Sequence, residues 1–165
     1  PRGRKEQLNR YFVPSAPART VVRVREEGGG LILTVKGGGE RDAGGIFRRP
    51  ERNRVIPPEW LFSLLDTGEC ADLLLDPVMN GVAPPLSYLG QLRNTRYLFN
   101  FESWTMELDH TFYPDGEEVW ELEIEAEDAE EALRRVSEWL DERRIPWEPS
   151  VSGKFSLFLV KSGLK

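Results

Sequence analysis

The chain has 165 residues, 39% hydrophobic and 30% charged, which is long enough for one domain with a buried core and excludes a disordered chain. Its apolar runs are too short to span a membrane, and the single cysteine, Cys70, excludes an internal disulfide. The net charge of −6 argues against binding a nucleic-acid duplex through the overall field, so we expect one cytoplasmic domain over residues 1–165 with no membrane partner.

Alternating residues predict strands in the first half of the chain. Apolar and polar side chains alternate over 20–25 and again over 31–36, and the three glycines 28–30 between them predict a hairpin turn. Two prolines followed by apolar residues at helical spacing predict a short helix over 57–67, which ends at a glycine. Residues 69–79 favour a further helical turn.

The second half predicts more strands and a longer helix. Three strands are expected, at 95–101, 104–111 and 119–125. Asp128 is typical of a helix cap, and apolar residues then recur at helical spacing up to a proline at 146. A last strand is predicted over 154–160, again from alternation. The tally predicts an α+β protein, mostly antiparallel β with two or three helices.

Charged residues occupy one face of several of these strands. The pairs and triplets at spacing two are Arg23 with Arg25, Thr34 with Lys36, Arg49 with Glu51, Asn94 with Arg96, and Glu121 with Glu123 and Glu125. One interpretation is that each of these charged faces is exposed to solvent, which is the usual arrangement of an antiparallel sheet. The other is a metal–polyphosphate site, because guanidinium groups grip phosphate oxygens and carboxylates bind hard divalent ions.

A series of short motifs adds a resemblance to this pattern. In chain order they are Gln7-Leu-Asn-Arg-Tyr-Phe12, Val22-Arg-Val-Arg25, Leu33-Thr-Val-Lys36, Arg49-Pro-Glu51, residues 89–96, Met106-Glu-Leu-Asp109, Glu121-Leu-Glu123 and Ser152-Gly-Lys-Phe155. Their order resembles that of the CYTH superfamily, the triphosphate tunnel metalloenzymes. The resemblance covers most of the chain between 7 and 158, weakest over 56–86, and is nearest to the plant and bacterial branch that hydrolyses inorganic tripolyphosphate.

The resemblance implies a fold and a set of roles. The fold is an antiparallel β-barrel that forms a charged tunnel, with flanking helices against its apolar face. The implied phosphate-binding residues are Arg23, Arg25, Lys36, Arg49, Arg96 and Lys154. The implied ligands of Mg²⁺ or Mn²⁺ are Glu51, Asp109, Glu121 and Glu123. The implied reaction is metal-dependent hydrolysis of a small-molecule triphosphate.

Two departures from the family pattern matter. Asn94 stands where the family often has lysine, which removes one cation. No E-x-E-x-K strand precedes Gln7, so the barrel is expected to be incomplete at its amino-terminal end and to lack carboxylates of the metal site. The resemblance then favours activity in a version with that strand over activity in this stretch alone.

Other functions stay open beside tripolyphosphate hydrolysis. A nucleoside-triphosphate hydrolase, a class IV-type adenylyl cyclase and a non-catalytic polyphosphate- or nucleotide-binding module would all use the same charged faces. Alternation places the only histidine, His110, on the apolar side of its strand, so we expect packing or solvent contact for it, and Cys70 is interpreted as a small buried residue.

Overall fold

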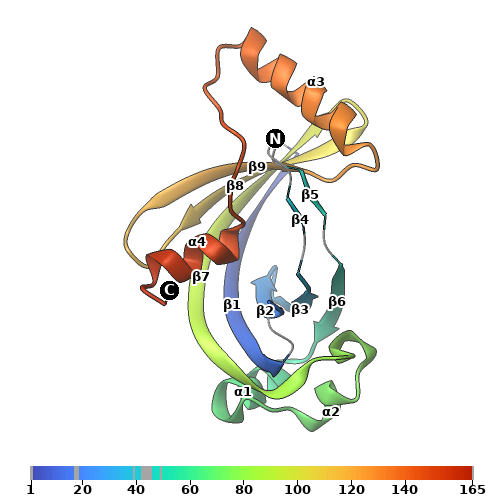
Figure 1. Cartoon of the computed structure of the whole chain (residues 1–165), viewed down its shortest axis with the longest axis vertical. Helices are drawn as coiled ribbons and strands as arrows, with labels where there is room; N and C mark the ends of the chain where they lie inside the picture. Colours follow the sequence, from blue (N-terminus) through green and yellow to red (C-terminus); the bar gives the residue numbers. More distant parts are fainter. Residues whose placement is uncertain (1, 17–18, 39, 42–45, 49, 165) are drawn as a thin grey trace. The chain divides into compact units, whose positions relative to one another are not determined.

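The computed structural model describes residues 2–16, 19–38, 40–41, 46–48 and 50–164. Seven strands form one sheet in the order β6-β3-β2-β1-β7-β8-β9, and β4 pairs with β5 separately (Figure 1). The strands of the main sheet are β1 (Gly3–Ala16), β2 (Val21–Glu27), β3 (Gly30–Lys36), β6 (Glu51–Ile56), β7 (Ala83–Phe101), β8 (Trp104–Phe112) and β9 (Glu118–Ile124). The small pair is β4 (Glu40–Arg41) and β5 (Phe47–Arg48).

The antiparallel sheet and its helices confirm the predicted α+β class. The helices are α1 (Pro58–Thr67), α2 (Ala71–Leu74), the 3-10 turn η1 (Pro77–Met79), α3 (Ala129–Glu142) and α4 (Lys154–Lys161). Within the described ranges β6 and β9 are the end strands of this order. No described helix is both long and apolar enough to cross a membrane.

The chain divides into two compact units, which are described separately. Unit 1 contains Pro1–Arg4, Glu40–Arg48 and Thr95–Lys165, and unit 2 contains Lys5–Gly39 and Arg49–Asn94. Both β1 and β7 have residues in each unit. The prediction of a single domain stays a prediction.

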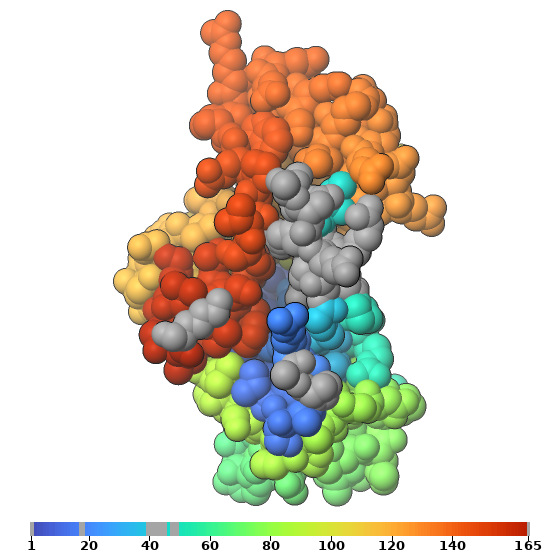
Figure 2. Space-filling view, in the orientation of Figure 1, coloured from blue at the N-terminus to red at the C-terminus, as the bar shows by residue number. Residues whose placement is uncertain are grey.

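Unit 2 is organised by the predicted hairpin. Gly28 and Gly29 have φ of +59° and +81°, which glycine adopts at little cost because it has no Cβ, and they join β2 to β3 in the expected register. Alternation then sends Val22 and Val24 to one face, where both are fully buried with Leu33. Helices α1 and α2, seen as green atoms in Figure 2, complete this core.

Helix α1 ends where the sequence indicates. Gly68 adopts φ of +74°, and its N–H donates to the carbonyl of Leu64. A Cβ at Gly68 would lie 2.5 Å from the backbone oxygen of Leu86, so this position requires glycine for space as well as for conformation. The N–H of Leu86 donates to the carbonyl of Gly68 at 2.7 Å, which joins the end of α1 to the beginning of β7.

Unit 1 has α3 beside strand residues of the same unit. The side chain of Asp128 accepts from the N–H of Glu131 at 2.9 Å, as the predicted cap requires. The apolar stripe of α3 packs Trp139 edge-on against Phe101, with ring centroids 5.7 Å apart. The helix therefore has the apolar partner that its pattern demands.

The predicted last strand over 154–160 is wrong, because these residues form α4. Phe155, Phe158 and Leu159 also fit helical spacing, and a short apolar run does not distinguish the two states by periodicity alone. Phe158 is 1% exposed, so burial of one helical face decided the outcome. The correction changes the element that carries Lys154.

Candidate functional site

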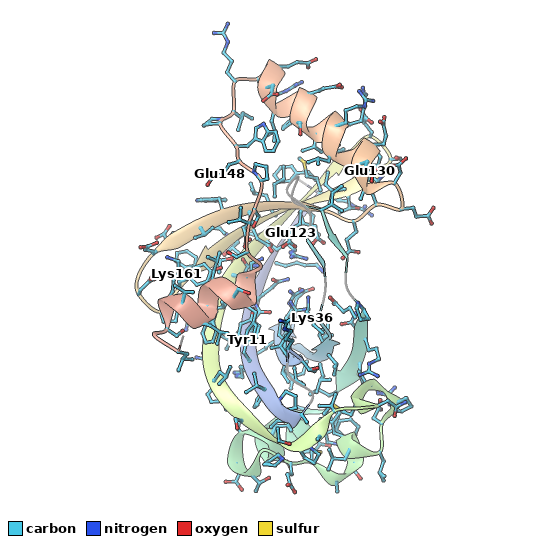
Figure 3. The ribbon with its side chains drawn as sticks, viewed as in Figure 1. Tyr11, Lys36, Glu123, Glu130, Glu148 and Lys161 are labelled. Atoms are coloured by element: carbon cyan, nitrogen blue, oxygen red, sulfur yellow. The ribbon has the colours of Figure 1, made fainter. Side chains whose placement is uncertain are left out.

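A row of basic side chains lies on the face of unit 2 opposite its apolar core. Strand pairing places Arg23 opposite Thr34 and Arg25 opposite Ile32, while Lys36 follows two residues after Thr34 on the same face. Figure 3 labels Lys36 on β3 and Tyr11 on the neighbouring β1, where Tyr11 pairs with Arg23 of β2. We call Arg23, Arg25 and Lys36 the basic row.

A hollow of about 380 Å³ opens beside this row. Its lining residues are Arg23, Arg25, Ile32, Thr34, Glu51, Asn53, Arg54 and Val55, all from β2, β3 and β6. Arg23 and Arg25 therefore face the hollow with one carboxylate, whereas Arg54 lies opposite Leu33 and pairs with Asp76 at 3.0 Å. Such a lining suits an anion of several oxygens better than an apolar ligand.

Neutral polar side chains hold the two arginines in place. Arg25 Nε donates to the amide oxygen of Asn9 at 3.1 Å, and Arg23 Nη2 donates to the hydroxyl of Thr34 at 3.2 Å. The Thr34 hydroxyl in turn donates to the amide oxygen of Asn53 at 2.7 Å. These contacts with uncharged side chains orient the two guanidinium groups.

Lys36 and Glu51 form a direct cross-strand pair. The two residues are opposite each other in the β3–β6 register, and Lys36 Nζ lies 2.8 Å from Glu51 Oε2. The carboxylate predicted to bind metal is therefore paired with a cation of the basic row. Its ability to bind metal is a prediction that this contact does not test.

Arg96 is the centre of a second cluster, in unit 1. Its Nε and Nη2 donate to the two oxygens of Asp109 at 2.7 and 2.6 Å, a bidentate pair, and Nη2 also donates to Glu123 at 3.1 Å. Its Nη1 forms an ion pair with Glu107. The Asp109 side chain is fully buried, so this pair is shielded from water.

Lys154 enters the same cluster from the first residue of α4. Its Nζ donates to Asp109 Oδ2 at 2.7 Å and lies 3.3 Å from Glu121 and 3.5 Å from Glu123. The register that sets Asp109 opposite Glu121 also sets Glu107 opposite Glu123, which gathers the carboxylates of β8 and β9. We call Arg96, Glu107, Asp109, Glu121, Glu123 and Lys154 the carboxylate cluster.

The carboxylate cluster has unequal protonation equilibria. Burial alone would raise the pKa of Asp109, but hydrogen bonds from Arg96 and the charge of Lys154 outweigh it and hold that pKa well below its usual range. Burial raises the pKa of Glu121 and of Glu107, and the neighbouring charge of Glu123 adds to both shifts. Four carboxylates face two cations, an excess of two negative charges when all are ionised.

The predicted site residues thus fall into two groups. Those in unit 2 are Arg23, Arg25, Lys36 and Glu51; those in unit 1 are Arg96, Asp109, Glu121, Glu123 and Lys154. Arg49 lies outside the described residues. Sequence reasoning assigned no role to Asn9, Asn53 or Glu107. Each lies two residues from a residue already named: Asn9 from Gln7, Asn53 from Glu51, and Glu107 from Asp109. Residues at this spacing share one face of a strand, which is the signal that could have identified them.

Other chemical candidates do not form sites. In the described part of the chain, no three histidine, cysteine, aspartate or glutamate residues form a preformed metal-binding group. His110 stacks on Trp120 with ring centroids 4.0 Å apart, on the opposite face of β8 from Asp109, and its Nε2 contacts Glu118. Cys70 is buried in the core of unit 2. Both fit the packing roles expected of them.

Known proteins share this arrangement of strands. A protein from Hippeastrum, described as a candidate adenylyl cyclase that reveals a dominant triphosphatase activity, has a TM-score of 0.77 at 23% identity, over 96% of this chain and 83% of that one. A candidate adenylate cyclase from Bacillus halodurans has a TM-score of 0.68 at 25% identity, over 94% and 82%. A third structure, the PH1012 protein of Pyrococcus horikoshii, has a TM-score of 0.58 at 18% identity, over 90% and 80%.

The family is shown by the sequence itself. Among curated protein sequences none matches the chain. The CYTH domain, however, matches residues 2–153, nearly the whole chain, which confirms the resemblance drawn from the ordered motifs. The protein therefore belongs to the CYTH domain family.

Proposed function

We propose that this protein binds a triphosphate on the basic row and hydrolyses one of its phosphoanhydride bonds with the help of a divalent metal ion. The observation that carries the proposal is the hollow beside Arg23 and Arg25, whose guanidinium groups are oriented by neutral partners. Guanidinium groups that are held beside a hollow are suited to stabilise charge on phosphate oxygens. Membership of the CYTH domain family supports the same chemistry.

Inorganic tripolyphosphate is the substrate that we favour. The described residues that line the hollow include no aromatic side chain on which a nucleotide base could stack. The apolar contribution to the lining is limited to Ile32 and Val55 and the stems of the arginines. A chain of phosphates alone would use the arginines without needing a base pocket.

The carboxylate cluster is our candidate for the metal-binding group, with Asp109, Glu121 and Glu123 as ligands of Mg²⁺ or Mn²⁺. Carboxylate oxygens are the donors that these hard ions prefer. Glu121 Oε2 is buried and makes no hydrogen bond; it lies 3.3 Å from Lys154 Nζ without hydrogen-bond geometry. The excess of two negative charges in the cluster equals the charge of one divalent ion.

The metal would polarise phosphate oxygens and a water molecule when bound. The role of the protein would then be electrostatic: Arg23 and Arg25 stabilise charge on the phosphate chain, and Arg96 and Lys154 limit the repulsion between the carboxylates. Glu51, which pairs with Lys36, stays a predicted metal ligand of unit 2. No general base is assigned.

A second candidate is an enzyme acting on nucleoside triphosphates, as a hydrolase or as a class IV-type adenylyl cyclase. The descriptions of two structural neighbours as candidate cyclases favour it. A third candidate is a non-catalytic binder of polyphosphate or nucleotides. We also propose a cytoplasmic location, which fractionation of cells that express the protein would test.

Phosphate release separates these functions. The protein is incubated with tripolyphosphate or ATP and with Mg²⁺, Mn²⁺ or a chelator, and inorganic phosphate and cyclic AMP are measured. Metal-dependent phosphate release from tripolyphosphate that is lost in Glu123→Gln supports the proposal. Cyclic AMP from ATP would favour the cyclase, and calorimetric binding of tripolyphosphate without turnover would favour the binder. Turnover that persists in Arg23→Gln, Arg25→Gln and Glu123→Gln alike would contradict the proposal.

A further inference from the structure

We propose that Asn9 is a further ligand-binding residue, whose side-chain NH₂ donates to an oxygen of the bound phosphate chain while its carbonyl oxygen positions Arg25. The inference deepens the proposed function and rests on it. Asn9 is neutral, and the motif Gln7–Phe12 that contains it assigned it no role, so charge does not point to it. The contacts of its amide do.

Asn9 lies in the middle of β1, next to the basic row. It is directly opposite Arg25 in the β1–β2 register and is 1% exposed. Gln7 and Tyr11, two residues away on either side, share its face and are also buried. A short polar side chain is thus enclosed at the point where β1 borders the basic row.

The orientation of the Asn9 amide is fixed by chemistry. The guanidinium group of Arg25 can only donate hydrogen bonds, so the atom that it contacts at 3.1 Å must be the carbonyl oxygen of Asn9. The NH₂ group must therefore occupy the other branch of the same planar amide. An alternative in which the two branches are exchanged would place donor against donor.

That NH₂ group has no acceptor in the described part of the chain, although it is buried. Arg23 Nε is a second buried donor without a hydrogen bond there, and Arg23 lies on the neighbouring strand opposite Tyr11. Buried donors are nearly always bonded, so two such donors on neighbouring strands indicate an acceptor other than the described residues. A phosphate chain supplies only acceptors; a water molecule is the competing occupant.

The neighbouring amide of Gln7 shows what a purely structural role looks like on this strand. Its oxygen accepts from Asn94 at 2.7 Å, and its NH₂ group donates to Glu27 at 2.6 Å. Both branches of that amide are used within unit 2. Asn9 differs from it in keeping one branch for a partner that the described part of the chain does not provide.

The test compares two variants that separate the roles of the amide. Asn9→Ala removes both branches, whereas Asn9→Asp keeps an oxygen for Arg25 but replaces the donor with a negative charge. Binding of inorganic tripolyphosphate is measured by calorimetry with a chelator present, so that no metal is needed. We expect about 10-fold weaker binding for Asn9→Ala and about 100-fold weaker binding for Asn9→Asp.

Asn100→Asp is the matched control. Asn100 is an exposed asparagine whose Oδ1 also accepts from an arginine, Arg2 Nη1 at 3.5 Å, and the same change there should leave affinity at the wild-type value. Circular dichroism and the melting temperature confirm that each variant folds. A structural role alone would lower the melting temperature of Asn9→Asp without making its affinity lower than that of Asn9→Ala.

The possible outcomes are distinct. Wild-type protein that binds no tripolyphosphate overturns the proposed function and this inference together. Wild-type binding with Asn9 variants of equal affinity overturns only the inference, and so does an Asn9→Asp variant that binds as well as Asn9→Ala or better. If Asn9→Asp does not fold, the side-chain amide resonance of Asn9 in wild-type protein decides. The inference expects it to shift as tripolyphosphate is added, and an unchanged resonance overturns it.

Discussion

The buried carboxylate of Asp109 is the most informative position to perturb in the carboxylate cluster. Asp109→Asn preserves the shape of the side chain but removes the charge that accepts two hydrogen bonds from Arg96 and one from Lys154. Removing one partner of a buried ion pair costs about 3–5 kcal/mol. Since three glutamates remain near the two cations, we expect a loss at the lower end, about 3 kcal/mol.

Urea unfolding followed by circular dichroism at pH 7 measures this loss. Glu131→Gln is the matched control, because Glu131 makes the same kind of contact with an arginine on the exposed surface of α3 and should change the midpoint little. The pKa of Asp109 is depressed in the folded protein, so its ionised form stabilises the fold above about pH 4, and this contribution is lost as the pH falls further. Equal unfolding midpoints for Asp109→Asn and wild type at pH 7 would refute the reasoning.

Three further predictions concern the basic row, the metal candidate and the end of α1. Arg23→Gln should weaken tripolyphosphate binding by about 10- to 100-fold in calorimetry, whereas Arg134→Gln on α3 should not. Glu121→Gln should raise the urea midpoint at neutral pH while reducing metal-dependent phosphate release. Burial raises the pKa of Glu121, so ionising it above about pH 4.5 costs the folded state stability. Gly68→Ala should lower the melting temperature more than Gly116→Ala, since both have positive φ but only at Gly68 would the added Cβ lie within 3 Å of a backbone atom.

Alternation was sufficient to predict the two faces of the strands around the basic row. A period of two places Val22 and Val24 on one side and Arg23 and Arg25 on the other, and the structure buries both valines completely. The same rule gathers Glu121 and Glu123 on one face of β9. Because successive side chains of a strand point to opposite faces, a charged residue between two buried residues must lie on the face opposite to theirs.

Hydrogen-bond partners and the nature of the last element were not predictable in this way. That Asp109 would bind both Arg96 and Lys154 depends on the pairing of β7 with β8 and on α4, and neither is encoded by local spacing. The run from Lys154 to Val160 fits a strand and a helix about equally. Burial of Phe158 in the folded protein decided in favour of the helix. Asn9 was not predicted, because its proposed role rests on a side-chain NH₂ group that has no acceptor among the described residues, and local spacing does not reveal this.

The central claim is that the basic row binds a triphosphate through its phosphate oxygens. The ³¹P resonances of inorganic tripolyphosphate, recorded with the protein and a chelator, report that contact directly. The account predicts broadened or shifted resonances with wild-type protein and unperturbed ones with the Arg23→Gln, Arg25→Gln double variant. Resonances that stay sharp and unshifted with the folded wild-type protein would contradict it.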